Sequence, residues 1–580
     1  MKNNIKQYFH PFLRDEIGKI LGLTLLLTPL SPPLFAEAPD NVSSVVTAEN
    51  DSAIQLLPDL PVIQDKLSML ANIKVKQFQF EGNSVFSDEE LSKITAPYEK
   101  EITAEELQEV KNKITQFYIE AGYTNSGAIL PDQKVADGII TIKIIEGKLS
   151  RVEVIGNKNL NDSYIQERLK GKEGAILNIN ELQERLQMLQ QEPLFETFQA
   201  ELGPGVKLGE SFLKMKVNEA RPYKFQFVFN NYRSPSVGAY RGEIRFWHHN
   251  FTGFLMDKGW GDTLYLRYGI TEGLNDVTLI YDLPLNNHGT TLSFNIERSD
   301  SEVVEKPFSQ LNIESEVDTY AITLRTPLIK RLRTTFDLAL RLEKRISHTY
   351  LLTQPFSFSP GVEEGKSNLS VIRFSQDFVN RSTFYVLAAR SSFNFGVDAN
   401  STINDDGSPD SQFFTWLGQF QYVRQLDFLS SSFLKESRVI FRTDFQWARE
   451  ELLPLEKLSI GGAMTVRGYR ENQLTRDNAL LSSLELRIPL LQKSIPGTTK
   501  KSEGNKLELS LFADYGRAWD THIETPEPKD IYSIGLGLNW SLNEKINTQV
   551  YWGYALRDIP VQNEKNLQDD GVHFEMSVLF

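Results

Sequence analysis

The chain has 580 residues, a formal net charge of −14 and no cysteine. The length allows several domains, the charge argues against a nucleic-acid-binding protein, and the missing cysteines exclude disulfides and thiolate metal sites. Beyond residue 35, no run approaches the roughly 18 apolar residues of a membrane-spanning helix. Aromatic residues are nonetheless abundant, with 36 Phe, 20 Tyr and 7 Trp. A membrane protein built from strands is compatible with both observations, because alternating barrel strands give a weak hydropathy signal.

The N-terminal segment has the pattern of a secretory signal peptide, which we expect to cover residues 1–38. It begins with basic residues, continues with a mostly apolar stretch, and ends at Ala36 and Ala38, which fit an A-x-A cleavage site. An amphipathic anchor is the alternative interpretation. Residues 39–72 are polar and contain prolines, so we expect a periplasmic linker there. Within it, only residues 62–70 could form a short helix that plugs a barrel.

An internal repeat with an offset of 74 to 75 residues follows. Its clearest match is Gly82-Asn83 with Gly156-Asn157. Each copy begins with a strand, continues with two helix signals and ends with further strands, which predicts a β-α-α-β-β unit present twice. Four capping signals predict the helix starts, and they begin at Ser87, Thr103, Ser163 and Asn178.

This β-α-α-β-β unit resembles the POTRA domain. The resemblance implies a first POTRA domain at residues 73–147 and a second at residues 148–219, both in the periplasm. Another small α/β module in tandem is the alternative. Domains of this kind have exposed strand edges, which can bind an extended peptide by adding it to the sheet.

From residue 220 to the C-terminus the pattern changes to a period of two. Tyr223, Phe225, Phe227 and Phe229, for example, alternate with more polar neighbours, as expected for strands that face lipid on one side and a polar lumen on the other. Sixteen such segments start near residues 222, 237, 261, 275, 288, 318, 333, 367, 382, 411, 436, 478, 506, 530, 545 and 571. We therefore predict a closed barrel of 16 antiparallel strands over residues 220–580, in which every backbone group is satisfied without an edge. A soluble β-sandwich or propeller is the alternative.

Most connections alternate between long and short, as a bacterial barrel requires, although those at 248–260 and 491–505 are longer than expected. The connection at 450–478 is long for a loop without structure of its own, and such loops are usually functional or disordered. Its apolar residues are too numerous to be left in water, and its glycines allow sharp turns. We predict a hairpin that folds back into the barrel cavity.

Several motifs resemble those of the two-partner-secretion transporters, the haemolysin-activator and filamentous-haemagglutinin transporter family of the Omp85 superfamily. They are the sixth-loop motif Val466-Arg467-Gly468-Tyr469, the barrel-wall motif Phe512-x-Asp514-x-Gly516, the first-POTRA motif with Pro131 and Gln133, and an alternating last strand ending in Phe580. In this family the terminal Phe belongs to the signal that the barrel-assembly machinery reads.

The resemblance implies that Asp514, on the lumen face of its strand, receives Arg467 from the loop. A guanidinium matches a carboxylate with two parallel hydrogen bonds. Removing one half of a buried pair costs about 3–5 kcal/mol, so the pair would hold the hairpin inside the barrel. The alternative is that both residues are unrelated and solvated.

Other candidate sites carry weaker signals. His248 and His249 are adjacent, but a position at the barrel rim accounts for them better than a metal site. The acidic segment 404–410 lacks the spacing and the final Glu of a calcium-binding loop. The sequence contains no phosphate-binding loop and no nucleophile elbow. We therefore expect no enzyme activity, no metal and no cofactor.

The resemblance implies an outer-membrane protein translocase of a diderm bacterium that exports its substrate without ATP. The expected partners are a large secreted exoprotein, recognised unfolded through its N-terminal secretion domain, the outer-membrane lipid, and the barrel-assembly machinery and periplasmic chaperones during biogenesis. No nucleic-acid partner is expected. An Omp85-type insertase of outer-membrane proteins is the first alternative, although it usually has more POTRA domains. A passive porin and an adhesin or structural barrel are further alternatives.

Overall fold

The computed structural model describes residues 72–580 except 136, 172–173, 360–361, 403–408, 429–431, 495–503, 544 and 561–564. The expected signal peptide, linker and plug helix lie outside the described residues. The described chain forms two compact units, one made of Tyr223–Phe251 with Asp262–Phe580, and the other made of residues 72–222 with Thr252–Gly261. Among the described residues, no helix has both the length and the apolar character needed to cross a membrane.

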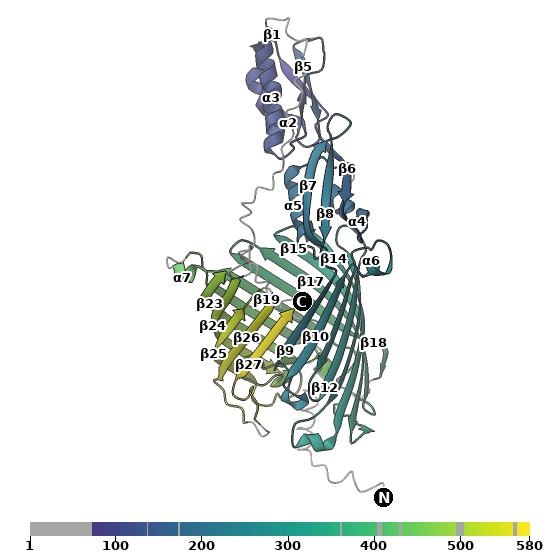
Figure 1. The fold of residues 1–580 in the computed structure, drawn as a ribbon, viewed down its shortest axis with the longest axis vertical. Helices are drawn as coiled ribbons and strands as arrows, with labels where there is room; N and C mark the ends of the chain where they lie inside the picture. The colour runs from purple at the N-terminus through teal and green to yellow at the C-terminus, as the bar shows by residue number, and fades with distance from the viewer. Residues whose placement is uncertain are drawn as a thin grey trace. The chain divides into compact units, whose positions relative to one another are not determined.

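The first POTRA-like domain contains a three-stranded sheet covered by two helices (Figure 1). In the sheet, β5 lies between a parallel neighbour, β2, and an antiparallel neighbour, β4. Both predicted capping boxes are present, at Ser87 with Glu90 and at Thr103 with Glu106. The elements are β1 (Ile73–Lys74), β2 (Gln77–Glu81), α2 (Asp88–Thr95), β3 (Glu101–Ile102), α3 (Ala104–Glu120), β4 (Gly127–Ile129) and β5 (Ile139–Ile145).

The second domain repeats this topology, because β8 lies between the parallel strand β6 and the antiparallel strand β7. The prediction that Ser163 caps its first helix was wrong. Asn161 is the N-cap, and its side chain accepts a hydrogen bond from the Ser163 N–H. Asn178 caps the second helix through the Asn180 N–H. The elements are β6 (Lys148–Ile155), α4 (Asp162–Lys170), α5 (Ile179–Gln190), β7 (Phe195–Pro204) and β8 (Glu210–Glu219).

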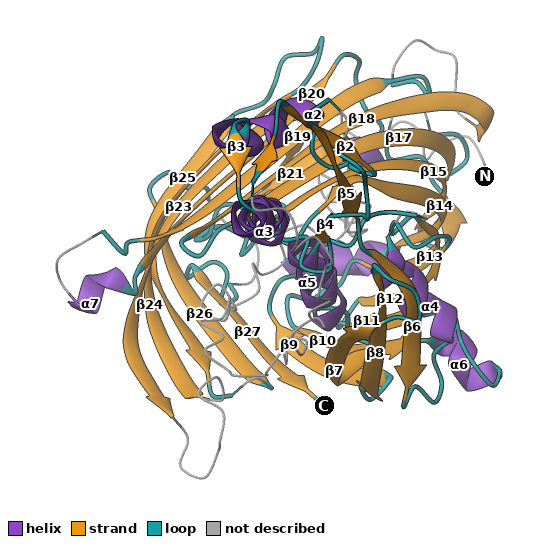
Figure 2. Cartoon of the chain, turned by 90° about the horizontal axis from the view of Figure 1, so that it is seen from above, coloured by secondary structure: helices purple, strands orange, loops and turns teal. Residues whose placement is uncertain are grey.

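The remaining strands form a closed antiparallel barrel (Figure 2). Within the described residues, sixteen strands make the wall, and β27 closes on β9 with Met576 opposite Phe229. The wall strands are β9 (Tyr223–Asn230), β10 (Arg241–His249), β11 (Thr263–Ile270), β12 (Leu274–Pro284), β13 (Thr291–Glu302), β14 (Ile313–Lys330), β15 (Thr334–Leu351), β17 (Lys366–Arg381), β18 (Tyr385–Thr402), β19 (Phe414–Gln425), β20 (Arg438–Ala448), β23 (Asn478–Ser494), β24 (Gly504–Trp519), β25 (Asp530–Ser541), β26 (Ile546–Ala555) and β27 (Val572–Leu579). The predicted 16-stranded fold is confirmed.

Alternation along each strand separates an apolar outer face from a polar lumen. On β9 the predicted outward residues Phe225, Phe227 and Phe229 are exposed. On β24 the inward residues Phe512 and Asp514 are buried. Shorter elements lie in the connections between wall strands, and they are β16 (Gln354–Pro355), β21 (Leu458–Ile460), β22 (Leu474–Arg476), α6 (Phe251–Leu255) and α7 (Ser432–Lys435).

Candidate functional site

The connection between β20 and β23 folds as a hairpin with its own core. At its base, β21 pairs with β22, with Ile460 opposite Leu474. Apolar side chains of the hairpin pack against the lumen face of the wall in one buried cluster, which consists of Leu458, Ile460, Val466, Tyr469, Leu474, Ala479, Leu481, Ala518 and Ile531. Gly461, Gly462 and Gly468 have positive φ angles, which other residues rarely adopt. The apolar residues of the loop therefore fix it against the wall.

Arg467, near the tip of the hairpin, reaches the carboxylate of Asp514 on β24. Its Nε donates to Oδ2 at 2.8 Å and its Nη2 donates to Oδ1 at 2.8 Å, so the two side chains form two parallel hydrogen bonds. The backbone N–H of Arg467 donates to the same carboxylate at 3.0 Å. Arg467 is 6% exposed and Asp514 is 3% exposed. The pair is therefore a buried, charge-assisted contact between loop and wall.

Further groups surround the guanidinium. Nη1 donates to Glu485 Oε2 at 2.6 Å, and Nη2 donates to Ser483 Oγ at 3.1 Å. The guanidinium carbon lies 3.6 Å from the ring centroid of Phe512 and 4.9 Å from that of Tyr551. Burial alone would lower the pKa of the guanidinium, but the Asp514 and Glu485 carboxylates together outweigh it and raise the pKa, so Arg467 stays charged. The barrel wall thus provides two carboxylates and two aromatic faces for one cation.

The other residues of the two motifs surround this pair. The Gly468 N–H lies 3.4 Å from His573 Nε2, and a Cβ on Gly468 would lie 2.8 Å from the carbonyl oxygen of Gly553. The Tyr469 hydroxyl donates to the carbonyl oxygens of Tyr532 and Arg557 at 2.9 and 3.0 Å. The tip therefore contacts β25, β26 and β27 as well as β24.

Gly516 makes room for the loop. A Cβ at Gly516 would lie 2.8 Å from Cγ2 of Val466 and 3.0 Å from Cδ1 of Ile460. Both of these side chains are fully buried. A larger residue in the barrel-wall motif would push the hairpin away from the wall.

A second anchor, which the sequence analysis missed, holds the base of the loop. Glu456 is buried and accepts hydrogen bonds from Arg373 at 2.8 and 3.1 Å and from Arg345 at 3.3 Å. The Leu455 carbonyl accepts another from Arg345 at 2.8 Å. Arg345 lies on β15 and Arg373 on β17, and both also contact Glu343. The loop is thus fixed to wall strands other than those that hold Arg467.

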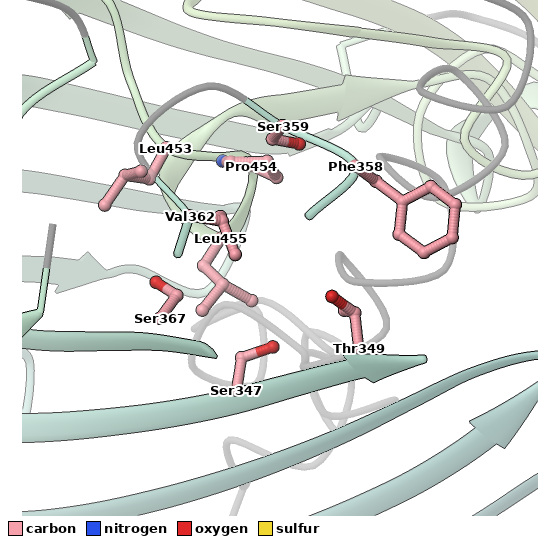
Figure 3. Close-up of a pocket in the computed structure, with 9 residues that line it drawn as sticks. All are labelled: Ser347, Thr349, Phe358, Ser359, Val362, Ser367, Leu453, Pro454 and Leu455. Carbon is pink, nitrogen blue, oxygen red and sulfur yellow. The ribbon is translucent and has the colours of Figure 1, made fainter. Parts of the chain in front are cut away.

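Apolar packing accompanies this second anchor. Figure 3 shows Pro454 and Leu455 lying over Ser347 and Thr349 of β15, in a small pocket that Phe358 also lines. Leu453, in the same segment, belongs to a buried cluster with Leu369 and Val371 of β17. The base of the loop is therefore packed on this wall as well as ion-paired with it.

A third contact links the hairpin to outer connections of the barrel. Arg470 forms a two-point ion pair with Asp569, at 2.5 and 2.8 Å, and another with Glu305 at 2.7 Å. The next residue, Glu471, accepts from the Ala463 N–H at 2.7 Å across the hairpin. Burial raises the pKa of Glu471 to about 7, against the smaller opposite effect of that N–H.

The hairpin lies inside the lumen with open volume around it. Lys457, Ser459 and Glu471 line a cavity of about 590 Å³. Ala463, Met464 and Arg467 line another of about 570 Å³. Arginines and carboxylates of the wall line both cavities beside apolar side chains such as Leu481, so charged groups face the open space around the hairpin.

The remaining candidate residues lie elsewhere. Gln133 Nε2 donates to the Thr141 carbonyl and its Oε1 accepts from the Thr141 N–H, both at 2.7 Å, so its amide extends the sheet beside β5 after Pro131. The Phe580 N–H donates to the Phe225 carbonyl at 2.8 Å, beside the barrel seam. His249 contacts Thr263 at 3.3 Å. In the described part of the chain, His, Asp and Glu side chains form no cluster that could hold a metal ion, and most of the acidic segment 404–410 lies outside it.

Comparison with known proteins identifies the family. Residues 209–540 match the model of the haemolysin secretion/activation protein ShlB/FhaC/HecB family, and residues 73–147 match the ShlB-type POTRA domain. The chain belongs to this family. The outer membrane transporter CdiB of Escherichia coli O6:K15:H31 is 22% identical over 450 residues, covering 73% of this chain and 71% of CdiB.

Two further relatives agree. The heme/hemopexin transporter protein HuxB of Haemophilus influenzae (strain Rd) is 22% identical over 467 residues, covering 78% of this chain and 77% of HuxB. The solved structure of CdiB from Escherichia coli has a TM-score of 0.67 at 19% identity, and the match covers 91% of this chain and 93% of that one. The chain is therefore an outer-membrane transporter of two-partner secretion, with periplasmic POTRA domains, and it belongs to a transporter family rather than to an enzyme class.

Proposed function

We propose that this transporter captures an unfolded exoprotein through its POTRA domains and passes it outward through the barrel when the sixth loop leaves its docked position. The observation that supports this most directly is the hairpin of residues 450–478 inside the lumen, held by Arg467 and Glu456 on different parts of the wall. A polypeptide in transit needs the volume that this hairpin occupies.

The periplasmic unit offers a place for capture. In the second domain β7 is an edge strand of ten residues, and in the first domain β2 is an edge strand of five. An edge strand presents backbone N–H and carbonyl groups that an extended chain can pair with, largely independently of its sequence. We propose that the N-terminal secretion domain of the exoprotein binds in this way.

The energy for export comes from outside the transporter in this proposal. No phosphate-binding loop occurs in the sequence, and the exoprotein gains folding free energy when it folds beyond the membrane. Folding outside prevents the exoprotein from sliding back and thereby gives transport its direction.

During biogenesis, the last strand with Phe580 is the segment that we expect the barrel-assembly machinery to recognise, after periplasmic chaperones have delivered the chain.

Capture from periplasmic extract tests this proposal. The bait is the full chain in detergent micelles, and the control is the same chain with residues 73–219 deleted. We expect the full chain to retain one large exoprotein through its N-terminal region and the control to lose it. Retention of many unfolded barrel proteins would instead support the insertase alternative, and retention of neither would contradict capture by the POTRA domains.

A further inference from the structure

The connection between β10 and β11 is the feature that the transport mechanism leaves unexplained. It covers residues 250–262, whereas tight turns of a few residues join other neighbouring strands, such as 331–333 between β14 and β15. Its ends are fixed, because His249 is the partner of Thr263 in the ladder and the Asn250 N–H donates to the Asp262 carbonyl at 2.5 Å. The connection therefore leaves the barrel rim at one defined point.

Four large apolar side chains project from this short connection into solvent. Phe254 is 74% exposed, Leu255 62%, Met256 55% and Trp260 48%. Scattered single apolar residues are normal on a protein surface, but a group of this density marks a contact with something else. Phe254 and Leu255 are the last two residues of α6 and Met256 follows directly, so the three form one exposed apolar turn.

The same segment has a fixed conformation, because Thr252–Gly261 packs with the second POTRA domain in one compact unit. The Gly259 N–H donates to the Asn159 carbonyl at 2.7 Å, and the Asn161 N–H donates to the Gly259 carbonyl at 3.0 Å. Lys258 forms an ion pair with Asp162, and its hydrogen bond lowers the pKa of that carboxyl. The backbone at Gly259 and the side chain of Lys258 are thus bound to the domain, while the four apolar side chains are exposed to solvent.

An aromatic row on the outer face of the wall precedes the apolar turn in the chain. Ring contacts run along the outer face from Phe225 to Phe246, with centroids 4.8 Å apart, then to His248 at 6.5 Å and to Phe251 at 5.7 Å. Phe251 is the first residue of α6. This aromatic row therefore ends at the residue that begins α6, and the exposed turn follows it in the sequence.

We propose that residues 251–260 form an interfacial membrane anchor, in which Phe254, Leu255, Met256 and Trp260 insert into the periplasmic leaflet of the outer membrane. The side follows from the POTRA domain, which is periplasmic and with which the segment forms one unit. Trp and large apolar residues are enriched at membrane interfaces, where an apolar face is buried while polar groups stay hydrated. The partner is the phospholipid surface itself.

Site-specific fluorescence in a lipid bilayer tests this anchor. The chain has no cysteine, so Met256→Cys can carry one environment-sensitive fluorophore in the full transporter, reconstituted into phospholipid vesicles that contain spin-labelled lipid. The matched control is Ile119→Cys, an exposed apolar position on α3 of the first domain. We expect a blue-shifted emission and strong quenching by the spin-labelled lipid at position 256, and neither effect at position 119.

Equal quenching at the two positions would overturn the proposal. A blue shift at position 256 that appears only after unfolded exoprotein is added would overturn it as well, because the turn would then contact polypeptide rather than lipid. Leu255→Cys provides a second labelling site if Met256→Cys fails to insert, and heat-modifiability in gels shows for each variant that the barrel is folded.

Discussion

At the scale of single residues, the loop depends on one buried cation. Arg467 donates to Asp514, Glu485 and Ser483 within one cluster, and the rings of Phe512 and Tyr551 lie against it. Such a charge is costly to bury alone and favourable only with all its partners in place. The cluster therefore has two states of clearly different free energy, docked with its partners or undocked and hydrated.

Replacing Arg467 tests this pair. Arg467→Ala leaves Asp514 buried without its cation, which weakens docking by about 3–5 kcal/mol. We expect export to fall, because a loosened loop no longer couples its release to the entry of the exoprotein. The barrel should remain inserted and heat-modifiable, and export is measured as secreted exoprotein per inserted transporter. Asp514→Ala should have the same effect, and the double variant should be no worse than either single one, because both remove the same interaction.

Arg467→Lys is the matched control, since it keeps the charge but loses the planar fork. It should give export between that of the native chain and Arg467→Ala. Normal export by Arg467→Ala at normal membrane levels would contradict the role of the pair.

Glu471 makes loop docking depend on pH. Its pKa is about 7 in the docked hairpin and returns to the ordinary value of 4.5 when the loop is hydrated. Between these two values the docked form binds more protons than the undocked form, so docking is fully favoured below the lower value and weakens as pH rises through the higher one. We expect a cysteine at the buried position Val466 to become more reactive toward thiol reagents as pH rises through about 7.

Thiol chemistry itself also depends on pH, so Val466→Cys must be compared with Val466→Cys combined with Glu471→Gln. The difference between the two profiles isolates the carboxyl group. Identical profiles would show that Glu471 does not control docking.

At the scale of elements, the strands were predictable and the second anchor was not. Strand positions follow from local alternation, and all sixteen predicted starts lie within a few residues of the observed strands, such as 478 for β23 and 530 for β25. Glu456 carried no local signal, because its partners Arg345 and Arg373 are 111 and 83 residues away in sequence. Charged residues at inward positions of β15 and β17 could have suggested a partner in a loop, but not which one.

The helix start in the second POTRA-like domain illustrates the same limit on a smaller scale. Ser163 and Asn161 are both good capping residues, and the sequence pattern favoured Ser163 because Gln166 follows at the right spacing. The structure starts α4 two residues earlier than predicted, at Asp162, with Asn161 as the cap. Propensity alone does not decide between two capping residues that lie two positions apart, because the packing of Ile165 and Leu169 into the core determines where the helix begins.

Replacing Glu456 tests the second anchor. Glu456→Gln removes one carboxylate from Arg345 and Arg373 but leaves Glu343, so we expect the loop base to loosen by about 1–3 kcal/mol. In planar bilayers the channel should open more often than in the native chain. Glu451→Gln, in the same loop, is the matched control and should behave like the native chain. Equal opening frequencies for Glu456→Gln and the native chain would contradict the anchor.

At the scale of the whole molecule, one hairpin is tied to several parts of the barrel at once. Its base contacts β15 and β17, its tip contacts β23 and β24, and Arg470 contacts outer connections through Glu305 and Asp569. Because these ion pairs hold the hairpin at several places, breaking one of them leaves the others intact. We therefore expect the loop to leave the lumen only when an incoming polypeptide replaces several contacts together.

The most direct test of this account locks the hairpin to the wall. A Cβ at Gly516 would lie 2.8 Å from Cγ2 of Val466, but Val466→Cys removes this methyl group. The space that it leaves allows a disulfide between Val466→Cys and Gly516→Cys in a chain without other cysteines. The measurement is export by the double variant before and after reduction, with each single variant treated in parallel. We expect the oxidised, locked transporter not to export, and we expect reduction to restore export. Undiminished export with the disulfide intact would contradict it, because the exoprotein would then cross the barrel while the loop stays docked.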